Sequence, residues 1–184
     1  MWYLIPSFLL SILFDFVLYH NLSMKQFPYT IISALFFYTM LINKTDNPAM
    51  IAKGLVFAQL LLLAGFFDAL THEIPDTLQV LIFIDGLIQI EPKQAFLGFF
   101  IVSVPLLVLA IITGGGVGGG DIKLMAACGW VLGPYGIVDG TIIGLLILIP
   151  FFYLVFRRKS KDKTKMYAMA PCLGIGCFIA YLMS

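Results

Sequence analysis

The stretch "TGGGVGGGDIKL", residues 113–124, interrupts a hydrophobic chain with six glycines in seven residues and an aspartate directly after them. Glycine loses more conformational entropy on entering a helix than any other residue, so residues 114–120 cannot sustain a stable helix by themselves. Apolar runs lie on both sides of the stretch. We therefore expect one helix to end at the glycines and the next to begin at Asp121.

The composition places this break inside a membrane protein. Of 184 residues, 61% are hydrophobic and only 11% are charged, and the mean hydropathy is +1.02. A soluble domain carries about 25% charged residues, so this chain lacks the polar surface that a soluble globule needs. Apolar runs of membrane-spanning length recur from end to end. We expect an all-α, polytopic transmembrane helix bundle, formed as a single domain over residues 1–184.

The polar residues, prolines and glycines that separate the apolar runs predict about eight helices, within a range of six to eight. They are expected at 2–19, 27–42, 49–70, 76–90, 94–113, 121–133, 136–156 and 167–183. The first run has no basic flank and no small-residue cleavage site, so we expect it to be a retained span. The runs 76–90 and 121–133 are shorter than the roughly 20 residues of a full span, and are expected to be half-buried among other helices or to begin below the headgroups.

A basic segment, "RRKSKDKTK" at 157–165, sets the expected orientation. It holds six of the eleven lysines and arginines. Basic loops lie on the cytoplasmic side, and the flanking apolar runs favour such a loop over a nucleic-acid-binding segment. Counting helices back from it places Asp68, Asp76 and Asp121 at the same, inner face of the membrane.

Four aspartates fall in or beside apolar runs, where an ionisable group costs about 2.5 to 3.5 kcal/mol on insertion scales. Asp15 lies near the inner end of the first helix, and we expect a structural role for it. Asp85 is expected inside 76–90, either neutral or hydrogen-bonded to another helix. Asp68 and Asp121 each lie where a helix meets a break, which suits a site. Capping of the first helical turn is the alternative role for Asp121.

Paired carboxyls at a membrane face have a specific chemistry. Two of them in a low-dielectric site cannot both ionise easily, so they share one proton. In aspartic proteases the charged partner takes a proton from water, while the protonated partner polarises the scissile carbonyl. The glycines would let an extended substrate backbone approach Asp121. Tight helix packing is the alternative use of glycine, and it suits Gly174 and Gly176 better.

The cysteines and His72 give less information about function. Cys128, Cys172 and Cys177 lie in apolar runs without a C-x-x-C pair, and we expect small buried hydrophobic side chains rather than a zinc site or disulfides. His72 lies in the loop after Asp68 and is expected to be a surface residue.

Two motifs resemble those of the type IV prepilin peptidases. "GGGVGGGDIKLMAACGWVLG" is similar to the G-x-G-D region of that family, with Gly118, Gly120 and Asp121 on the motif and Lys123 following it. The family's first aspartate precedes an Ile-Pro-Asn element by six residues, and here Asp68 precedes Ile74 and Pro75 by that spacing. The final apolar run also resembles the family's last helix, with Pro171 at the matching place. The resemblance spans roughly 60–184.

The resemblance implies an intramembrane aspartyl endopeptidase with Asp68 and Asp121 as the catalytic pair. Gly118, Gly120, Pro75, Asp76 and Lys123 would support the site or the substrate. Such enzymes remove the basic leader of prepilins or pseudopilins at the cytoplasmic face, in front of the substrate's apolar helix. The implied partners are that substrate and membrane lipid, with no nucleic acid. No metal or organic cofactor is implied.

This chain departs from the family pattern at three places. Asp76 stands where the family has Asn, and Leu70 stands where many members have Arg. The first inner loop, "HNLSMKQ", lacks the cysteine-containing segment that larger members link to N-methylation. We therefore expect peptidase activity without methyltransferase activity, as in the small members of the family.

Three other readings make different predictions. A small proton-coupled transporter would use Asp15 and Asp85 with the broken helix, although no inverted repeat is visible. A non-catalytic assembly protein would hold other helices in small-residue grooves and would tolerate loss of Asp68 and Asp121. A protease of the presenilin or signal-peptide-peptidase kind would carry Tyr before its first aspartate, where this chain has Phe67.

Overall fold

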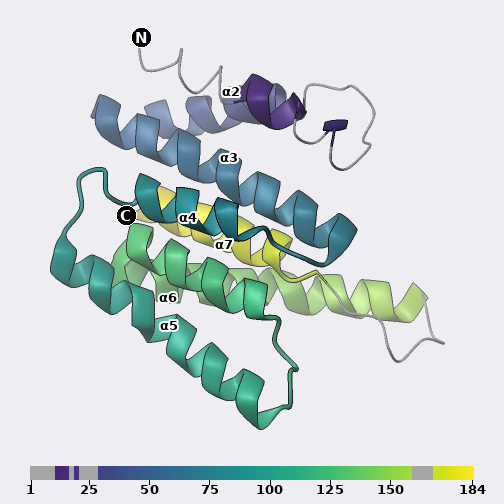
Figure 1. The fold of residues 1–184 in the computed structure, drawn as a ribbon. Coiled ribbons are helices and arrows are strands. Elements are labelled where there is room, and N and C mark those ends of the chain that lie inside the picture. The colour runs from purple at the N-terminus through teal and green to yellow at the C-terminus, as the bar shows by residue number, and fades with distance from the viewer. Residues whose placement is uncertain (1–10, 17–18, 21–28, 159–167) are drawn as a thin grey trace.

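The computed structural model describes residues 11–16, 19–20, 29–158 and 168–184. Within these residues every regular element is a helix, which confirms the expected fold class (Figure 1). Short helical pieces lie at 11–16 and 19–20. The labelled helices are α2 (Tyr29–Ile42), α3 (Pro48–Thr71), α4 (Asp76–Asp85), α5 (Pro92–Ile112), α6 (Gly119–Arg158) and α7 (Ala170–Met183). Most of the basic segment 157–165 lies outside the described residues, and so does much of the expected first helix.

Three of these helices have the length and apolar composition to cross a membrane. They are Pro48–Thr71, Pro92–Ile112 and the part of α6 at Gly119–Phe151. Ile32–Ile42 and Ala170–Met183 are apolar but shorter. The chain is therefore an integral membrane protein.

Local sequence signals fix both ends of α3. At its start the side chain of Asn47 accepts a 3.0 Å hydrogen bond from the backbone N–H of Ala49, and Pro48 occupies the first helical position. An asparagine cap followed by proline is a favoured helix start. At its end His72 takes a left-handed conformation, with φ 57° and ψ 24°, and its N–H donates to the carbonyl of Asp68. The expected range 49–70 is thus correct to within one residue at each end.

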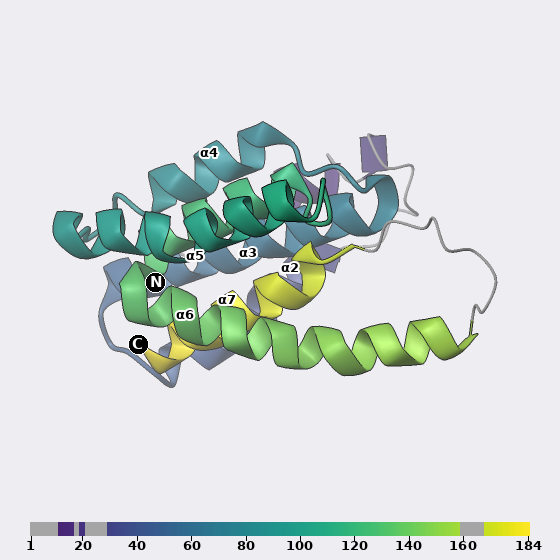
Figure 2. The same ribbon diagram turned by 90° about the horizontal axis from the view of Figure 1, so that it is seen from below.

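The helix α6 consists of two antiparallel arms. Gly133 has φ 71° and ψ −178°, which is not a helical conformation, and it separates residues 119–132 from 134–158. Figure 2 shows the second arm returning along the bundle in the opposite direction to the first. We expected two helices at 121–133 and 136–156, and the structure confirms the break but narrows it to this one residue.

The core is centred on α3, which packs against α2, α4 and α7. Its largest fully buried side chains include Phe57, Leu60 and Leu63. Glycines bring other backbones into direct contact. A Cβ at Gly176 would overlap the carbonyl oxygen of Gly140, and one at Gly129 would overlap that of Gly98. These contacts join α7 to the second arm of α6, and α5 to the first arm.

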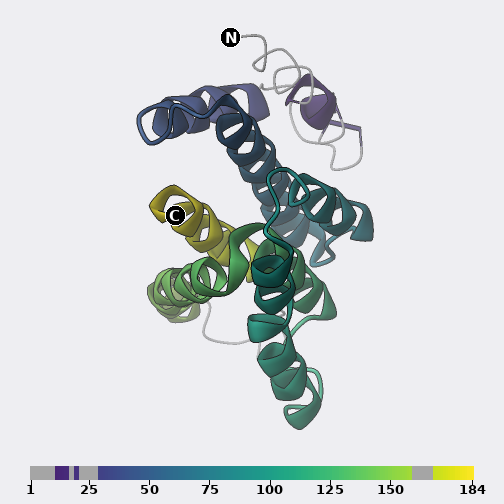
Figure 3. The same ribbon diagram turned by 90° about the vertical axis from the view of Figure 1, so that its left-hand side faces the viewer.

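The bundle has two distinct ends. The linkers 72–75 and 113–118 lie at one end, and the linker 86–91 lies with the C-terminus at the other (Figures 1 and 2). Figure 3 looks along the bundle and shows α5 at its margin, packed on α6. The ends of α3 and α5 and the starts of α4 and α6 therefore meet at one end, and the candidate site lies there.

Candidate active site

Asp68 lies in the last turn of α3 and is only 7% exposed. Its Oδ2 accepts a 2.8 Å hydrogen bond from the backbone N–H of Ala170, the first residue of α7. Backbone N–H groups in the first turn of a helix have no partner within that helix, and a carboxyl oxygen is a suitable acceptor for one of them. The bond therefore fixes the carboxyl of Asp68 and joins the ends of two helices.

A tight turn leads the chain from Asp68 into α4. Thr71 Oγ1 donates to the carbonyl of Phe67 at 2.8 Å and accepts from the backbone N–H of Glu73 at 3.3 Å. Pro75 is the N-cap of α4, and Asp76 is its first residue. The Ile-Pro element therefore ends the turn and begins the next helix.

Asp121 lies in the first turn of α6 and is 8% exposed. The helix begins at Gly119, so the expected start at Asp121 is late by two residues. Its side chain accepts no backbone hydrogen bond in the described part of the chain, and its Oδ1 is buried without a partner. No capping hydrogen bond to Asp121 is therefore seen in the described residues, although this acid lies in the first helical turn, where a negative charge is favoured. Gly119 and Gly120 adopt helical geometry despite their low propensity, and packing of Gly120 on Ile74 supports that turn.

Two interactions bring the segment 68–76 together with the segment 118–123. The charge of Asp68 acts electrostatically on the carboxyl of Asp121. A Cβ at Gly120 would lie 3.4 Å from the side chain of Ile74, so the backbone of the glycine segment lies on the Ile-Pro element. The buried carboxyls of Asp68 and Asp121, which are far apart in the chain, therefore lie at the same end of the bundle.

An exposed ion pair closes the same end of the site. Lys123 Nζ lies 2.8 Å from Oδ1 of Asp76, and both side chains are mostly exposed. The acid that replaces the family's asparagine therefore has a basic partner of its own. Gly118 lies beside Asp121, because a Cβ at this glycine would be 3.2 Å from Oδ2 of Asp121.

The glycine segment in front of Asp121 is open. Gly114 and Gly115 have φ of 63° and 98°, a region that glycine adopts without strain and other residues rarely adopt. No atom lies within 4 Å of a Cβ built at either position or at Gly119. An approaching chain could therefore reach the backbone of this segment without displacing other residues.

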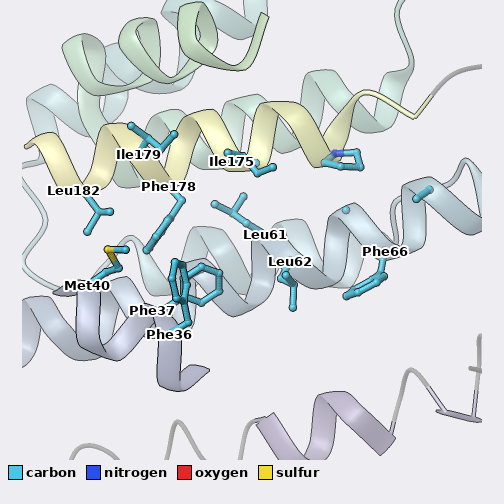
Figure 4. Close-up of a pocket in the computed structure, with 15 residues that line it drawn as sticks. Phe36, Phe37, Met40, Leu61, Leu62, Phe66, Ile175, Phe178, Ile179 and Leu182 are labelled. Carbon is cyan, nitrogen blue, oxygen red and sulfur yellow. The ribbon is translucent and has the colours of Figure 1, made fainter. Parts of the chain in front are cut away.

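An apolar groove lies between α2, α3 and α7 (Figure 4). Its volume is about 500 Å³. Ala69 and Pro171 line one end, and they are the sequence neighbours of Asp68 and of its hydrogen-bond donor Ala170. In Figure 4 the side chains of Phe37, Leu61 and Phe178 lie between the facing helices, while Met40 and Leu182 lie at the far end. The groove thus reaches the sequence neighbours of Asp68 and Ala170, although Asp68 itself does not line it.

The two remaining acids lie elsewhere. Oδ1 of Asp15 accepts a 3.0 Å hydrogen bond from the backbone N–H of Thr30, which is a structural contact. Asp85 is the last residue of α4 and is 4% exposed, and neither of its carboxyl oxygens has a hydrogen-bond partner in the described residues. The expected cross-helix hydrogen bond is therefore absent there. The buried Lys53 of α3 acts on Asp85 electrostatically.

Lys53 is a residue that sequence reasoning missed. Its signal was a single lysine in the apolar run "MIAKGLVF". The other minor residues lie as expected: the three cysteines are buried, and His72 is exposed. Leu70, at the position where many relatives of the resembled family have Arg, is 52% exposed. No group of three or more possible metal ligands occurs within the described ranges.

Comparison with known proteins identifies a family. Residues 55–156 match the type IV leader peptidase family, and this range covers more than half of the chain and includes Asp68 and Asp121. A protein of Bacillus subtilis (strain 168), "Prepilin leader peptidase/N-methyltransferase", is 38% identical over 77 residues. That match covers 42% of this chain and 31% of the Bacillus protein, so the chain aligns with less than a third of its length. No solved structure matches the chain.

Proposed function

This chain belongs to the type IV leader peptidase family, and we propose that it is an aspartyl endopeptidase that removes the leader of type IV prepilins or pseudopilins. Asp68 and Asp121 are its proposed catalytic pair, and cleavage takes place at the cytoplasmic face of a prokaryotic membrane. The observation that carries the proposal is the meeting of these two buried carboxyls, from α3 and α6, at one end of the bundle.

The proposed reaction is hydrolysis through a shared proton. One carboxylate removes a proton from a water molecule, and the oxygen of this water attacks the scissile carbonyl carbon. The protonated partner donates a hydrogen bond to the carbonyl oxygen. The departing nitrogen then takes up a proton, which yields a free carboxyl and a free amine. The Ala170 N–H supports this role by orienting Asp68, and Oδ1 of Asp121 has no hydrogen-bond partner in the described residues that would compete with the reaction.

The substrate would reach the pair along two surfaces. Its apolar helix would lie in the groove between α2, α3 and α7, which ends at Ala69 and Pro171 beside Asp68. Its extended backbone at the scissile bond would pass the open glycines in front of Asp121. The presence of Ala69 and Pro171 at the end of the groove supports this path, because they are sequence neighbours of Asp68 and of its hydrogen-bond donor Ala170.

The surroundings of the site suggest roles for the supporting residues. Lys123 balances the charge of Asp76, so we infer that this pair positions α4 against α6. Glu73 is exposed and forms no ion pair in the described part of the chain, which makes it the acid available to a basic leader. We further propose that the chain is a peptidase without methyltransferase activity, because its three cysteines lie in α6 and α7 and none lies in the first loop.

Co-expression with a prepilin from the same genome tests the proposal. Leader removal is followed by gel shift and by N-terminal sequencing of the product. Asp68→Asn and Asp121→Asn should each lower cleavage at least about 10³-fold, since each removes a partner of a proton-sharing pair. Asp85→Asn is the matched control, because it also neutralises a buried acid but lies at the other end of α4.

The control also separates the peptidase from a carrier. All variants must reach normal membrane levels before cleavage is compared. Cleavage that survives both Asp68→Asn and Asp121→Asn would falsify the two-aspartate mechanism. Dependence on Asp85 and Asp15 with indifference to the pair would favour the proton-coupled transporter instead.

A further inference from the structure

A second cavity lies at the end of the bundle opposite Asp68 and Asp121, with a volume of about 440 Å³. One wall comes from the linker between α2 and α3 and from the start of α3, and the facing wall comes from the linker between α4 and α5 and the start of α5. The turn at Gly133 and the end of α7 complete it. Lys53 in this cavity and Asp68 share α3, and at 1.5 Å per residue they lie about 22 Å apart along its axis.

The two facing walls carry opposite charges. Lys44 and Lys53 belong to the first wall, and Glu91 belongs to the second, where it accepts a hydrogen bond from the side-chain amide of Gln94. Lys53 is only 5% exposed. Burial of an ammonium group is costly unless an acceptor or an opposite charge meets it.

Protein groups meet this requirement only in part. Asp85 acts on Lys53 electrostatically, but the two side chains form no ion pair, and neither carboxyl oxygen of Asp85 accepts a hydrogen bond in the described residues. Trp130 lines the same cavity, and its indole nitrogen is buried without a partner in the described residues. A buried lysine and a tryptophan with an unpaired N–H group therefore line one cavity, and both call for an acceptor.

We propose that this cavity binds the zwitterionic headgroup of a phospholipid, with its phosphate at Lys53 and Trp130 and its amine at Glu91. Phosphate oxygens are acceptors, which is what the first wall lacks, and an amine beside the phosphate matches the acid on the second wall. The depth also fits. Lys53 lies about 8 Å along α3 from the helix start, close to the boundary between headgroups and hydrocarbon. Apolar residues complete the lining beside the glycerol and the first methylenes: Leu41, Met50, Ile90, Val131 and Leu132.

Tryptophan fluorescence gives a direct test, because the chain has two tryptophans and Trp130 lines this cavity. Full-length Trp2→Phe protein, delipidated in detergent, is titrated with dihexanoylphosphatidylethanolamine, dihexanoylphosphatidylglycerol or inorganic phosphate. We expect a saturable change in Trp130 emission, with the ethanolamine lipid binding at least about 5-fold tighter than the glycerol lipid. Glu91→Gln should abolish that preference, and Glu91 is exposed, so the change should not disturb folding.

Variants at Lys53 test the phosphate contact. Lys53→Met alone leaves Asp85 as an uncompensated buried acid, so it is paired with Asp85→Asn, and this double variant should bind at least about 10-fold more weakly. Lys93→Met removes an exposed lysine at the same end that does not line the cavity, and binding should be unchanged. Repeating the titration on the inactive Asp68→Asn protein separates this proposal from the peptidase, because binding should persist there.

Three results would overturn the headgroup assignment. Lack of saturation by either lipid would remove the site. Equal binding of inorganic phosphate would assign the cavity to a free anion rather than to lipid. Loss of binding in Lys93→Met equal to that in the Lys53 double variant would show a surface charge effect.

Discussion

The backbone N–H of Ala170 donates a 2.8 Å hydrogen bond to Oδ2 of Asp68, so the first residue of α7 orients a buried carboxyl at the end of α3. The two residues are 102 positions apart in the chain. A carboxyl that must act on a water molecule depends on placement as well as on chemical type, and displacement by about 1 Å can cost about 10²-fold in rate.

Asp68→Glu separates placement from chemistry, because it keeps the acid and moves it by one methylene. We expect cleavage to fall about 10²-fold or more, measured as the initial rate of leader removal by purified enzyme in detergent. Asp76→Glu makes the same change in an exposed carboxyl and should keep the rate within about threefold. A wild-type rate for Asp68→Glu would mean that the hydrogen bond to Ala170 does not set the catalytic geometry.

The ion pair between Lys123 and Asp76 predicts a charge-reversal pattern. Lys123→Asp places two acids side by side, and since an exposed pair contributes about 0.2 to 1 kcal/mol, cleavage should fall by about two- to fivefold. The double variant Lys123→Asp with Asp76→Lys restores opposite charges and should recover most of the rate. The effect should shrink at high salt, which screens exposed charges.

This pattern distinguishes positioning from substrate attraction. If Asp76 instead bound a basic leader, the double variant would stay impaired, because it leaves a lysine at position 76. Glu73→Gln would then have little effect, whereas we expect it to raise KM for a substrate with a basic leader and to leave kcat unchanged.

Two glycines on α7 predict opposite effects on stability. A Cβ at Gly176 would overlap the backbone of Gly140, so Gly176→Ala should destabilise the fold by about 1–3 kcal/mol. A Cβ at Gly174 would lie 3.6 Å from Leu61, an ordinary contact, so Gly174→Ala should be neutral or stabilising by up to about 1 kcal/mol. Thermal unfolding in detergent measures both. Equal melting temperatures for the two variants would contradict the packing of α7 on α6.

Helix ends marked by local signals could be predicted from the sequence, and those decided by packing could not. The expected range 49–70 differs from α3 by one residue at each end, because Asn47 and Pro48 mark its start and a polar turn marks its end. The expected helix 76–90 instead ends at Asp85, where Gly86 lies against the indole of Trp130 from α6. Gly86 is a local stop signal, but the contact with Trp130 that fixes the helix end joins segments far apart in the chain and cannot be predicted from local residues.

The same distinction applies to the candidate site. The breaks at Asp68 and Asp121 are visible in the sequence because an acid beside a turn in an apolar run is conspicuous. Their hydrogen-bond environment is not visible, since Ala170 is an unremarkable residue in an apolar run. Lys53 was missed for a related reason: its burial depends on the way α2, α4 and α7 pack on α3.

The open glycines predict a rate effect without a stability effect. Gly115→Ala forces an alanine toward φ 98°, which costs about 1–3 kcal/mol unless the segment shifts. Because no atom packs on this position, the segment should shift, and cleavage should fall while the melting temperature stays within about 2 °C. Gly119→Ala, in the first helical turn and equally open, should leave cleavage unchanged. Equal rates for both variants would show that the path of the segment does not affect cleavage.

The apolar groove beside Asp68 predicts a block that depends on substrate. Ile175 lines the groove and is 52% exposed, so Ile175→Trp should fill the groove without disturbing the core. We expect KM for a full-length prepilin to rise at least about 10-fold, because the substrate's apolar helix can no longer bind in the groove. Ile142→Trp is a matched control, since Ile142 is also 52% exposed but lies on α6 outside the groove. A short leader peptide without the apolar helix should be cut equally by both variants. If the two variants have the same KM for full-length substrate, the substrate's helix binds elsewhere.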